Sequence, residues 1–178
     1  MIATNPDTPL RMAMAQARDQ HDQDLLDLTH QRPVLLVFLR HFGCTFCREA
    51  AADIGRDRER IEDQGVLPVF VHMSPLAKGE KFFSNYRGLN GVRHISDPEQ
   101  KLYKAFQLKR GNMRQLFGLK SWVRGFQAGI MGGHLVGMLA GDGFQMPGIF
   151  LIRQGQVERE FRHDSAADRP DYVSMAYV

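Results

Sequence analysis

The sequence predicts an α/β fold in which a central mixed sheet is flanked by helices. Strand-like and helix-like segments alternate three times along the 178 residues, and a hairpin follows them. Val34 to Leu39 is a continuous apolar run, which is typical of a strand buried on both faces. Gln154-Gly155 lies between two strand-like segments, as the turn of an antiparallel hairpin does. The sheet should therefore contain both parallel and antiparallel strands.

The chain as a whole, residues 1–178, is predicted to form one domain that begins with an extension over residues 1–32. One helix is expected in the extension, roughly from Thr8 to Gln20. Pro33 suits the residue that opens the first strand. After that strand, apolar residues recur at helical spacing from Phe46 to Ile61. Gly65 suits the left-handed residue that ends this helix.

The remaining elements follow the same alternation. A second strand is expected from Val66 to Met73, and Pro68 within it requires an edge position or a bulge. Asp97 and Pro98 together are typical of the start of a helix, with Asp97 as its cap. The other predicted elements are a helix from Lys78 to Arg87, a strand from Val92 to Ile95, a helix ending at Phe106, and a hairpin of Ile149–Arg153 and Gln156–Phe161.

Residues 108–143 interrupt this order and are interpreted as an insert. Five basic residues and no acidic one lie among aromatic residues between Leu108 and Phe126, and seven glycines lie in residues 125–143. We expect an amphipathic helix followed by a glycine-rich loop. The simplest interpretation is a helix whose aromatic side chains cover the core. An anionic ligand, a membrane surface or a homodimer contact through the insert is the alternative.

Composition limits the class of protein. The net charge of +3 is too small to indicate a nucleic-acid partner, and no stretch is apolar and long enough to span a membrane. The N-terminus lacks the basic and then apolar pattern of a secretory signal, so we expect a cytoplasmic protein. Two cysteines are too few for a secreted disulfide framework.

Both cysteines lie in HFGCTFCREA, between the first strand and the helix after it. Free N–H groups at the start of a helix favour a thiolate at Cys44, and Arg40, His41 and Arg48 add positive charge nearby. Residues three apart on a helix are neighbours, so Cys44 and Cys47 can form a disulfide after a modest rearrangement. Cys44 is then the exposed attacking thiol, and Cys47 is the core-facing resolving thiol.

Other interpretations of the cysteine pair remain open. A zinc site needs about four ligands, and the histidines other than His41 show no ligand spacing. Two small core residues are a further possibility. The position between a strand and a helix favours a redox dithiol, for which no metal and no organic cofactor is expected. The charged runs at residues 162–164 and 168–171 are interpreted as turn caps and solvated ion pairs.

Four segments carry a family resemblance: VFLRHFGCTFCREAAADI, DPEQKLYKAFQLKRG, QMPGIFLIRQGQV and FRHDSAADRPDY. Together they resemble the peroxiredoxin-like branch of the alkyl hydroperoxide reductase/thiol-specific antioxidant superfamily, over roughly residues 30–173. The resemblance implies a thioredoxin fold, a peroxide substrate and an external thiol reductant. It also places Met146-Pro147 where such folds keep a cis-proline facing the cysteines; a proline that simply begins a strand is the alternative.

The chain departs from the peroxidase pattern of this superfamily at three points. Peroxiredoxins carry P-x-x-x-T-x-x-C, and counting back from Cys44 puts His41 at the Thr and Val37 at the Pro. The distant Arg of the pattern, expected near Pro147, also lacks a counterpart. Arg40 or His41 is the expected substitute donor. A disulfide is therefore the second substrate class, and the other hypotheses are a redox-sensing binding module and other enzyme chemistry with the insert as a lid.

Overall fold

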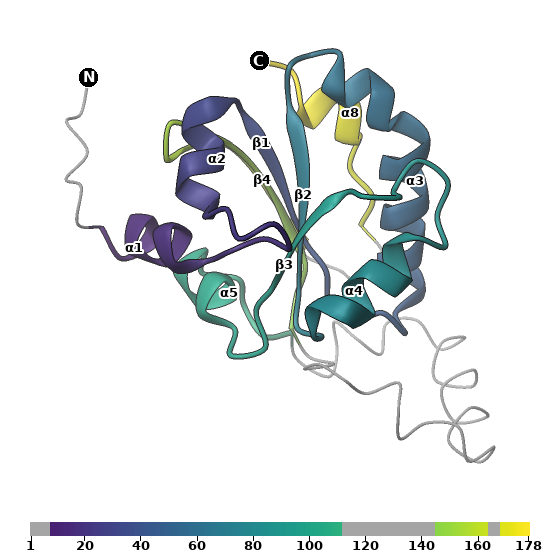
Figure 1. Cartoon of the computed structure of the whole chain (residues 1–178), viewed down its shortest axis with the longest axis horizontal. Coiled ribbons are helices and arrows are strands. Elements are labelled where there is room, and N and C mark those ends of the chain that lie inside the picture. The colour runs from purple at the N-terminus through teal and green to yellow at the C-terminus, as the bar shows by residue number, and fades with distance from the viewer. Residues whose placement is uncertain (1–7, 112–144, 164–167) are drawn as a thin grey trace.

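A mixed five-stranded sheet forms the centre of the molecule, as predicted (Figure 1). The computed structural model describes residues 8–111, 145–163 and 168–178. In the order β3-β2-β1-β4-β5, strands β1, β2 and β3 are parallel, β4 runs antiparallel to β1, and β5 runs antiparallel to β4. The strands are β1 (Val34–Phe38), β2 (Leu67–His72), β3 (Arg93–Ser96), β4 (Gly148–Arg153) and β5 (Gln156–Arg162).

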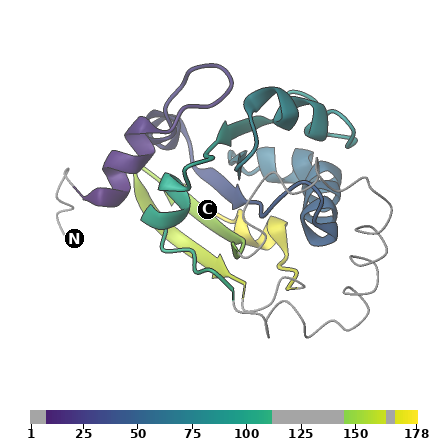
Figure 2. The same cartoon turned by 90° about the horizontal axis from the view of Figure 1, so that it is seen from below.

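Helices cover both faces of this sheet (Figure 2). One face carries α1, α2 and α5, whose apolar side chains share a core cluster with Leu36 and Phe38 of β1. The other face carries α3, α4 and α8, which share a second cluster with Leu35 and Val37. Side chains of a strand alternate between faces, which explains how one apolar strand supplies both clusters. The helices are α1 (Pro9–Gln16), α2 (Leu25–Gln31), α3 (Thr45–Glu62), α4 (Leu76–Phe83), α5 (Lys101–Ala105) and α8 (Tyr172–Met175).

The N-terminal extension differs from its prediction, because it holds two helices instead of one. α1 ends at Gln16, and a turn follows in which the Asp19 carboxylate accepts hydrogen bonds from two backbone N–H groups. α2 begins after Asp24, whose side chain accepts from the Asp27 N–H at 2.8 Å. Asp24, a residue type that is preferred as a helix N-cap, was the sequence signal for this helix. The expected continuous helix to Gln20 is wrong.

Strand β2 lies between β1 and β3, so the expectation of an edge position or bulge for Pro68 is wrong. The Leu67 N–H donates to the Pro33 carbonyl on the β1 side, and the next residue therefore turns its nitrogen toward β3. Pairing with β3 begins only at Val69. Pro68 loses no ladder hydrogen bond, because its missing N–H would face a position without a partner strand.

The later elements agree with the prediction within a few residues. The Asp97 carboxylate accepts from the N–H groups of Lys101 and Leu102 at 2.8 Å and so caps α5. Gln154 and Gly155 both have positive φ and join β4 to β5. The predicted insert lies outside the described residues beyond Gly111. No helix in the described ranges has both the length and the apolar character to cross a membrane.

Candidate active site

Cys44 and Cys47 occupy the start of α3, just after β1. Cys44 is the N-cap residue, and Cys47 lies in the first turn. Both are free thiols and both are buried, with exposed fractions of 0% and 3%. The predicted exposure of Cys44 is therefore wrong. Its sulfur is part of the core cluster on this face of the sheet, and the buried side chain of Arg40 lies against it.

The surroundings of Cys44 favour its thiolate. A hydrogen bond from the Cys47 thiol is the largest influence, and the pKa of Cys44 is lowered to about 6 although burial opposes the shift. The positive charge of Arg40 lowers this pKa further, and Arg40 Nη1 lies 3.7 Å from the Cys44 sulfur. The N–H groups of Cys47 and Phe46, at the open end of the helix, also donate to the sulfur. Cys44 is thus mainly a thiolate at neutral pH.

Cys47, in contrast to Cys44, is held in its protonated thiol form. The hydrogen bond that it gives to Cys44, together with burial, raises its pKa well above the usual thiol value. The Arg40 N–H donates to the Cys47 sulfur at 3.2 Å, which offsets only part of this effect. The pair therefore carries one thiolate and one thiol, with the proton on Cys47.

Arg40 connects the thiols to the segment that precedes β4. Its Nε donates to the Gln145 carbonyl at 3.0 Å, while Nη1 reaches Cys44. The buried side chain of Gln145 donates to the carbonyls of Leu108 and Met146. Gln145 thus fixes the carbonyl that orients the guanidinium. No local sequence pattern indicates Gln145, because its contacts join segments that lie far apart along the chain.

His41 contributes no positive charge to the site, contrary to the prediction. Burial, and then the charges of Arg40 and Arg48, lower its pKa to about 4. The ring is therefore neutral at pH 7, and its buried Nδ1 has no hydrogen-bond partner. Arg48 donates through Nε to the Phe42 carbonyl at 3.1 Å and so fixes the loop before Cys44. Arg40 is the nearby cation that acts on the thiolate.

Met146 and Pro147 lie directly before β4, the antiparallel neighbour of β1. Phe38 at the end of β1 is paired with Gly148, so this proline faces the loop that leads to the cysteines. The described residues contain no cis peptide bond, so the Met146–Pro147 bond is trans and the cis alternative is wrong. The Met146 N–H donates to the Lys109 carbonyl at 3.1 Å.

A cavity of about 30 Å³ lies beside Cys47, which is room for a water-sized molecule. Its wall is built from β1, α3, the Pro147 segment and the residues after β5. The polar or charged side chains that line it, besides Cys47, are those of Arg40, Glu49, His163, Asp168, Arg169 and Tyr172. Three of these, His163, Asp168 and Arg169, belong to the charged runs that were predicted to be turn caps and solvated ion pairs. A cluster of ionisable residues after the hairpin was the available signal.

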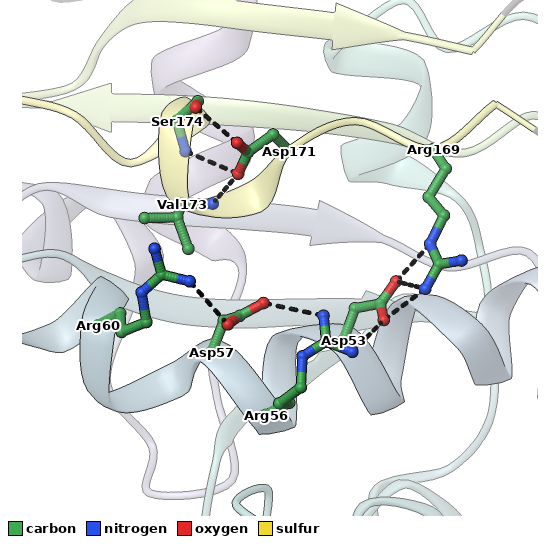
Figure 3. A network of polar contacts seen from close by, with 8 residues as sticks. All are labelled: Asp53, Arg56, Asp57, Arg60, Arg169, Asp171, Val173 and Ser174. Carbon is green, nitrogen blue, oxygen red and sulfur yellow. Dashed lines mark hydrogen bonds and ion pairs between the residues drawn. The ribbon is translucent and has the colours of Figure 1, made fainter.

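An ion-pair network holds the C-terminal segment against α3 (Figure 3). Both Arg169 Nε and Nη2 donate to the Asp53 carboxylate at 2.6 Å, and Arg56 donates to the same group at 3.0 Å. Asp171 accepts from the N–H groups of Val173 and Ser174 and caps α8, as expected of a turn cap. The ion pair with Asp53 therefore holds Arg169, which lines the cavity beside Cys47.

Asp53→Asn is expected to lower the stability of the protein by about 1 kcal/mol at pH 7, because both arginines face solvent. Burial raises the Asp53 pKa, but hydrogen bonds and charge from Arg169 and Arg56 outweigh it, and the net pKa is lowered. A carboxyl with a lowered folded-state pKa stabilises above its unfolded value of about 3.8. Urea unfolding should show the difference between the two proteins shrinking as the pH falls below that value. A constant difference across the range would contradict this assignment.

Alkylation of Cys44 should follow a titration with its midpoint near pH 6. The thiolate reacts and the thiol does not, so the rate rises with pH through this midpoint and is flat above it. Cys47→Ala should move the midpoint upward, because it removes the largest cause of the lowered pKa. Mass spectrometry of peptides alkylated at a series of pH values separates the two cysteines. A midpoint near the ordinary value of about 8.5 in the unmodified protein would contradict the prediction.

The family model described as "AhpC/TSA antioxidant enzyme" matches residues 53–166. The chain belongs to the AhpC/TSA antioxidant enzyme family. The match begins after Cys47, so the family assignment rests on the sheet and helices that follow the dithiol. This family member is accordingly an enzyme of the thiol oxidoreductase type. Among its described residues, no group of three or more His, Cys, Asp or Glu side chains is arranged to hold a metal ion.

Two further comparisons place the family member among peroxiredoxin-like proteins. It is 29% identical over 159 residues to prostamide/prostaglandin F synthase of Xenopus laevis, covering 87% of this chain and 76% of the relative. It is 26% identical to mouse (Mus musculus) peroxiredoxin-like 2A, covering 84% and 66%. Xanthomonas campestris peroxiredoxin Q has the same fold, with a TM-score of 0.60, 15% identity and coverage of 88% and 86%. The predicted thioredoxin-like fold and peroxiredoxin-like family are confirmed.

Proposed function

We propose that this enzyme reduces peroxides through a two-cysteine cycle. The Cys44 thiolate attacks one peroxide oxygen, so that an S–O bond forms, the O–O bond breaks and the departing alkoxide or hydroxide takes up a proton. Cys47 then attacks the Cys44 sulfenic acid, an S–S bond forms and water leaves. An external thiol reductant supplies two electrons and restores both thiols.

The pairing of a Cys44 thiolate with a protonated Cys47 carries this proposal. Attack requires a nucleophile at neutral pH, and a pKa of about 6 provides one. Resolution requires a second thiol that already contacts the first, and Cys47 gives its hydrogen bond to Cys44. Arg40 supplies a guanidinium from the end of β1, where it can also donate to a peroxide oxygen beside the thiolate. It would take the part of the Thr and the distant Arg, the two peroxide-holding groups of the peroxidase pattern that this chain lacks.

The substrate class follows from the family and from the names of relatives. Peroxide is favoured by membership in an antioxidant enzyme family. Relatives named prostamide/prostaglandin F synthase make an oxygenated lipid a substrate class worth testing beside hydrogen peroxide. A disulfide remains the second candidate, because a buried dithiol at a helix start suits exchange chemistry equally. We propose the cytoplasm as the location, where a thiol system can act as reductant.

A comparison of three oxidants tests the proposal: hydrogen peroxide, an organic hydroperoxide and a small disulfide, each mixed in turn with reduced enzyme. Cys44 should be oxidised fastest by one of the peroxides, and counting free thiols should show two lost per turnover. Cys44→Ser should remove the reaction, whereas Cys47→Ser should stop at a sulfenic acid that a dimedone-type reagent traps. Faster oxidation by the disulfide would assign the enzyme to thiol–disulfide exchange. Oxidation of Cys44 without turnover in excess reductant would support a redox-sensing module instead.

A further inference from the structure

The resolving step creates a chemical requirement that the two cysteines do not meet alone. Cys47 must lose its proton as it attacks the Cys44 sulfur, and its pKa lies well above the usual thiol value. In the reduced pair Cys44 accepts the Cys47 hydrogen bond as a thiolate. Once Cys44 carries an oxygen or a second sulfur, that negative charge is gone. Another group near Cys47 must then take the proton.

The cavity beside Cys47 contains a suitable group in His163. Its volume of about 30 Å³ suits one water molecule, which could bridge two side chains on its wall. His163 lines this cavity, and its Nδ1 is buried without a hydrogen-bond partner. The backbones of Pro147 and Asp168 hydrogen-bond to the imidazole. Because Nδ1 is unpaired, these contacts fall on Nε2, which fixes the proton there and leaves a lone pair on Nδ1.

The protonation state of His163 fits the role of a proton acceptor. Burial lowers its pKa below the usual histidine value, although the nearby Asp168 and the backbone contacts oppose this shift. The ring is therefore neutral at pH 7 and can accept a proton. Other charged groups that face the cavity are Arg40 after β1, Glu49 of α3 and Arg169 of the C-terminal segment. Tyr172 also lines the cavity, but burial raises the pKa of its hydroxyl well above the usual tyrosine value, so the neutral hydroxyl is no base at this pH.

We propose that His163, through a water molecule in this cavity, accepts the proton that Cys47 loses when it attacks Cys44. The bond that forms is Cys47–Cys44, the leaving group departs from Cys44 with the bonding electrons, and the proton moves from Cys47 through the water to His163 Nδ1. His163 then passes the proton to the leaving group, so that a hydroxide leaves as water. The inference rests on the proposed two-cysteine cycle, and it adds a residue and a cavity to that cycle.

Dithiodipyridine, a small aromatic disulfide, separates the two steps. Attack by Cys44 releases a first thiopyridone and attack by Cys47 releases a second, so stopped-flow absorbance records both rates. His163→Gln should leave the first release near the wild-type rate and slow the second by about tenfold or more at pH 7. Glutamine keeps an N–H near the position of Nε2 for the Pro147 carbonyl but supplies no base. Tyr172→Phe should retain the second rate within about twofold.

The pH dependence of the second release distinguishes proton transfer from a structural effect. In His163→Gln the second rate should rise with pH by up to about tenfold per unit, because hydroxide replaces the imidazole. The wild-type second rate should be nearly flat between pH 7 and about pH 8. Equal second rates in both proteins, or equal slowing in Tyr172→Phe, would overturn the inference and leave the two-cysteine cycle standing. Absence of the first release in the wild type would contradict the cycle itself.

Discussion

Arg40→Gln is expected to raise the pKa of Cys44 and to slow its reaction with peroxide at pH 7 by about tenfold or more. The positive charge of Arg40 is one cause of the lowered pKa, and its Nη1 lies 3.7 Å from the sulfur. A pKa of about 6 leaves the thiol mostly ionised at pH 7. A pKa one unit above the pH leaves only about a tenth of it ionised. The variant also loses the Arg40 guanidinium, the donor that can hold the leaving oxygen of the peroxide.

Arg48→Gln is the matched control for this prediction. Arg48 is also a cation near Cys44 in the sequence, but its Nε donates to the Phe42 carbonyl instead. We expect that Arg48→Gln leaves the pKa of Cys44 nearly unchanged. Oxidation rates measured from pH 5 to about pH 9 separate a pKa change from loss of the donor, because only the donor effect persists at high pH. Thermal melts show whether each variant folds. Identical pH profiles for Arg40→Gln and wild type would refute the role of Arg40.

Gly88→Ala is expected to destabilise the protein by about 3 kcal/mol or more. Gly88 has φ of +83°, where a Cβ is disfavoured. A Cβ at this position would lie 2.1 Å from the Gly55 carbonyl oxygen of α3, and neither partner can move without shifting backbone. Arg58 also donates to the Gly88 carbonyl at 2.9 Å, so the loop is fixed against the helix. Urea unfolding measures the loss.

Gly91→Ala separates the destabilisation caused by the steric contact from that caused by the backbone conformation. Gly91 has φ of +68°, and nothing lies within 4 Å of a Cβ built there. This variant should cost only about 1 kcal/mol, the conformational part of the effect. The difference between the two variants then measures the close approach of the loop to α3. Similar losses in Gly88→Ala and Gly91→Ala would show that the contact is not responsible.

Local patterns were sufficient to predict the fold of the sheet. The apolar run at residues 34–39 and the turn at Gln154-Gly155 depend on short-range chemistry, and both predicted strands are present in the structure. The N-terminal turn was missed because Asp19 is satisfied by backbone groups a few residues away, a pattern that resembles a polar helix face. Pro68 was misjudged because its tolerance depends on where β3 begins to pair.

The site was predictable only where its residues are close in sequence. Cys44, Cys47 and Arg40 lie within one strand–helix junction, where the Cys47 hydrogen bond, the Arg40 charge and the N–H groups of the helix start lower the pKa of Cys44. The burial of Cys44 and the neutral state of His41 depend on desolvation by distant segments, which no local pattern reports. Gln145 contacts Arg40 and His163 lines the cavity beside Cys47 only because β4 pairs with β1 and β5 pairs with β4.

The pairing of Arg110 with Gln145 has a consequence for how the family can diversify. This bridge holds together the residues on either side of the segment 112–144. It lies next to the Gln145 carbonyl that accepts the hydrogen bond from Arg40. Closing a longer loop between fixed ends costs only about 0.6 kcal/mol for each doubling of its length. Insertions and deletions between these points are therefore thermodynamically cheap. The length of that segment can therefore change while Cys44, Cys47 and Arg40 keep their positions.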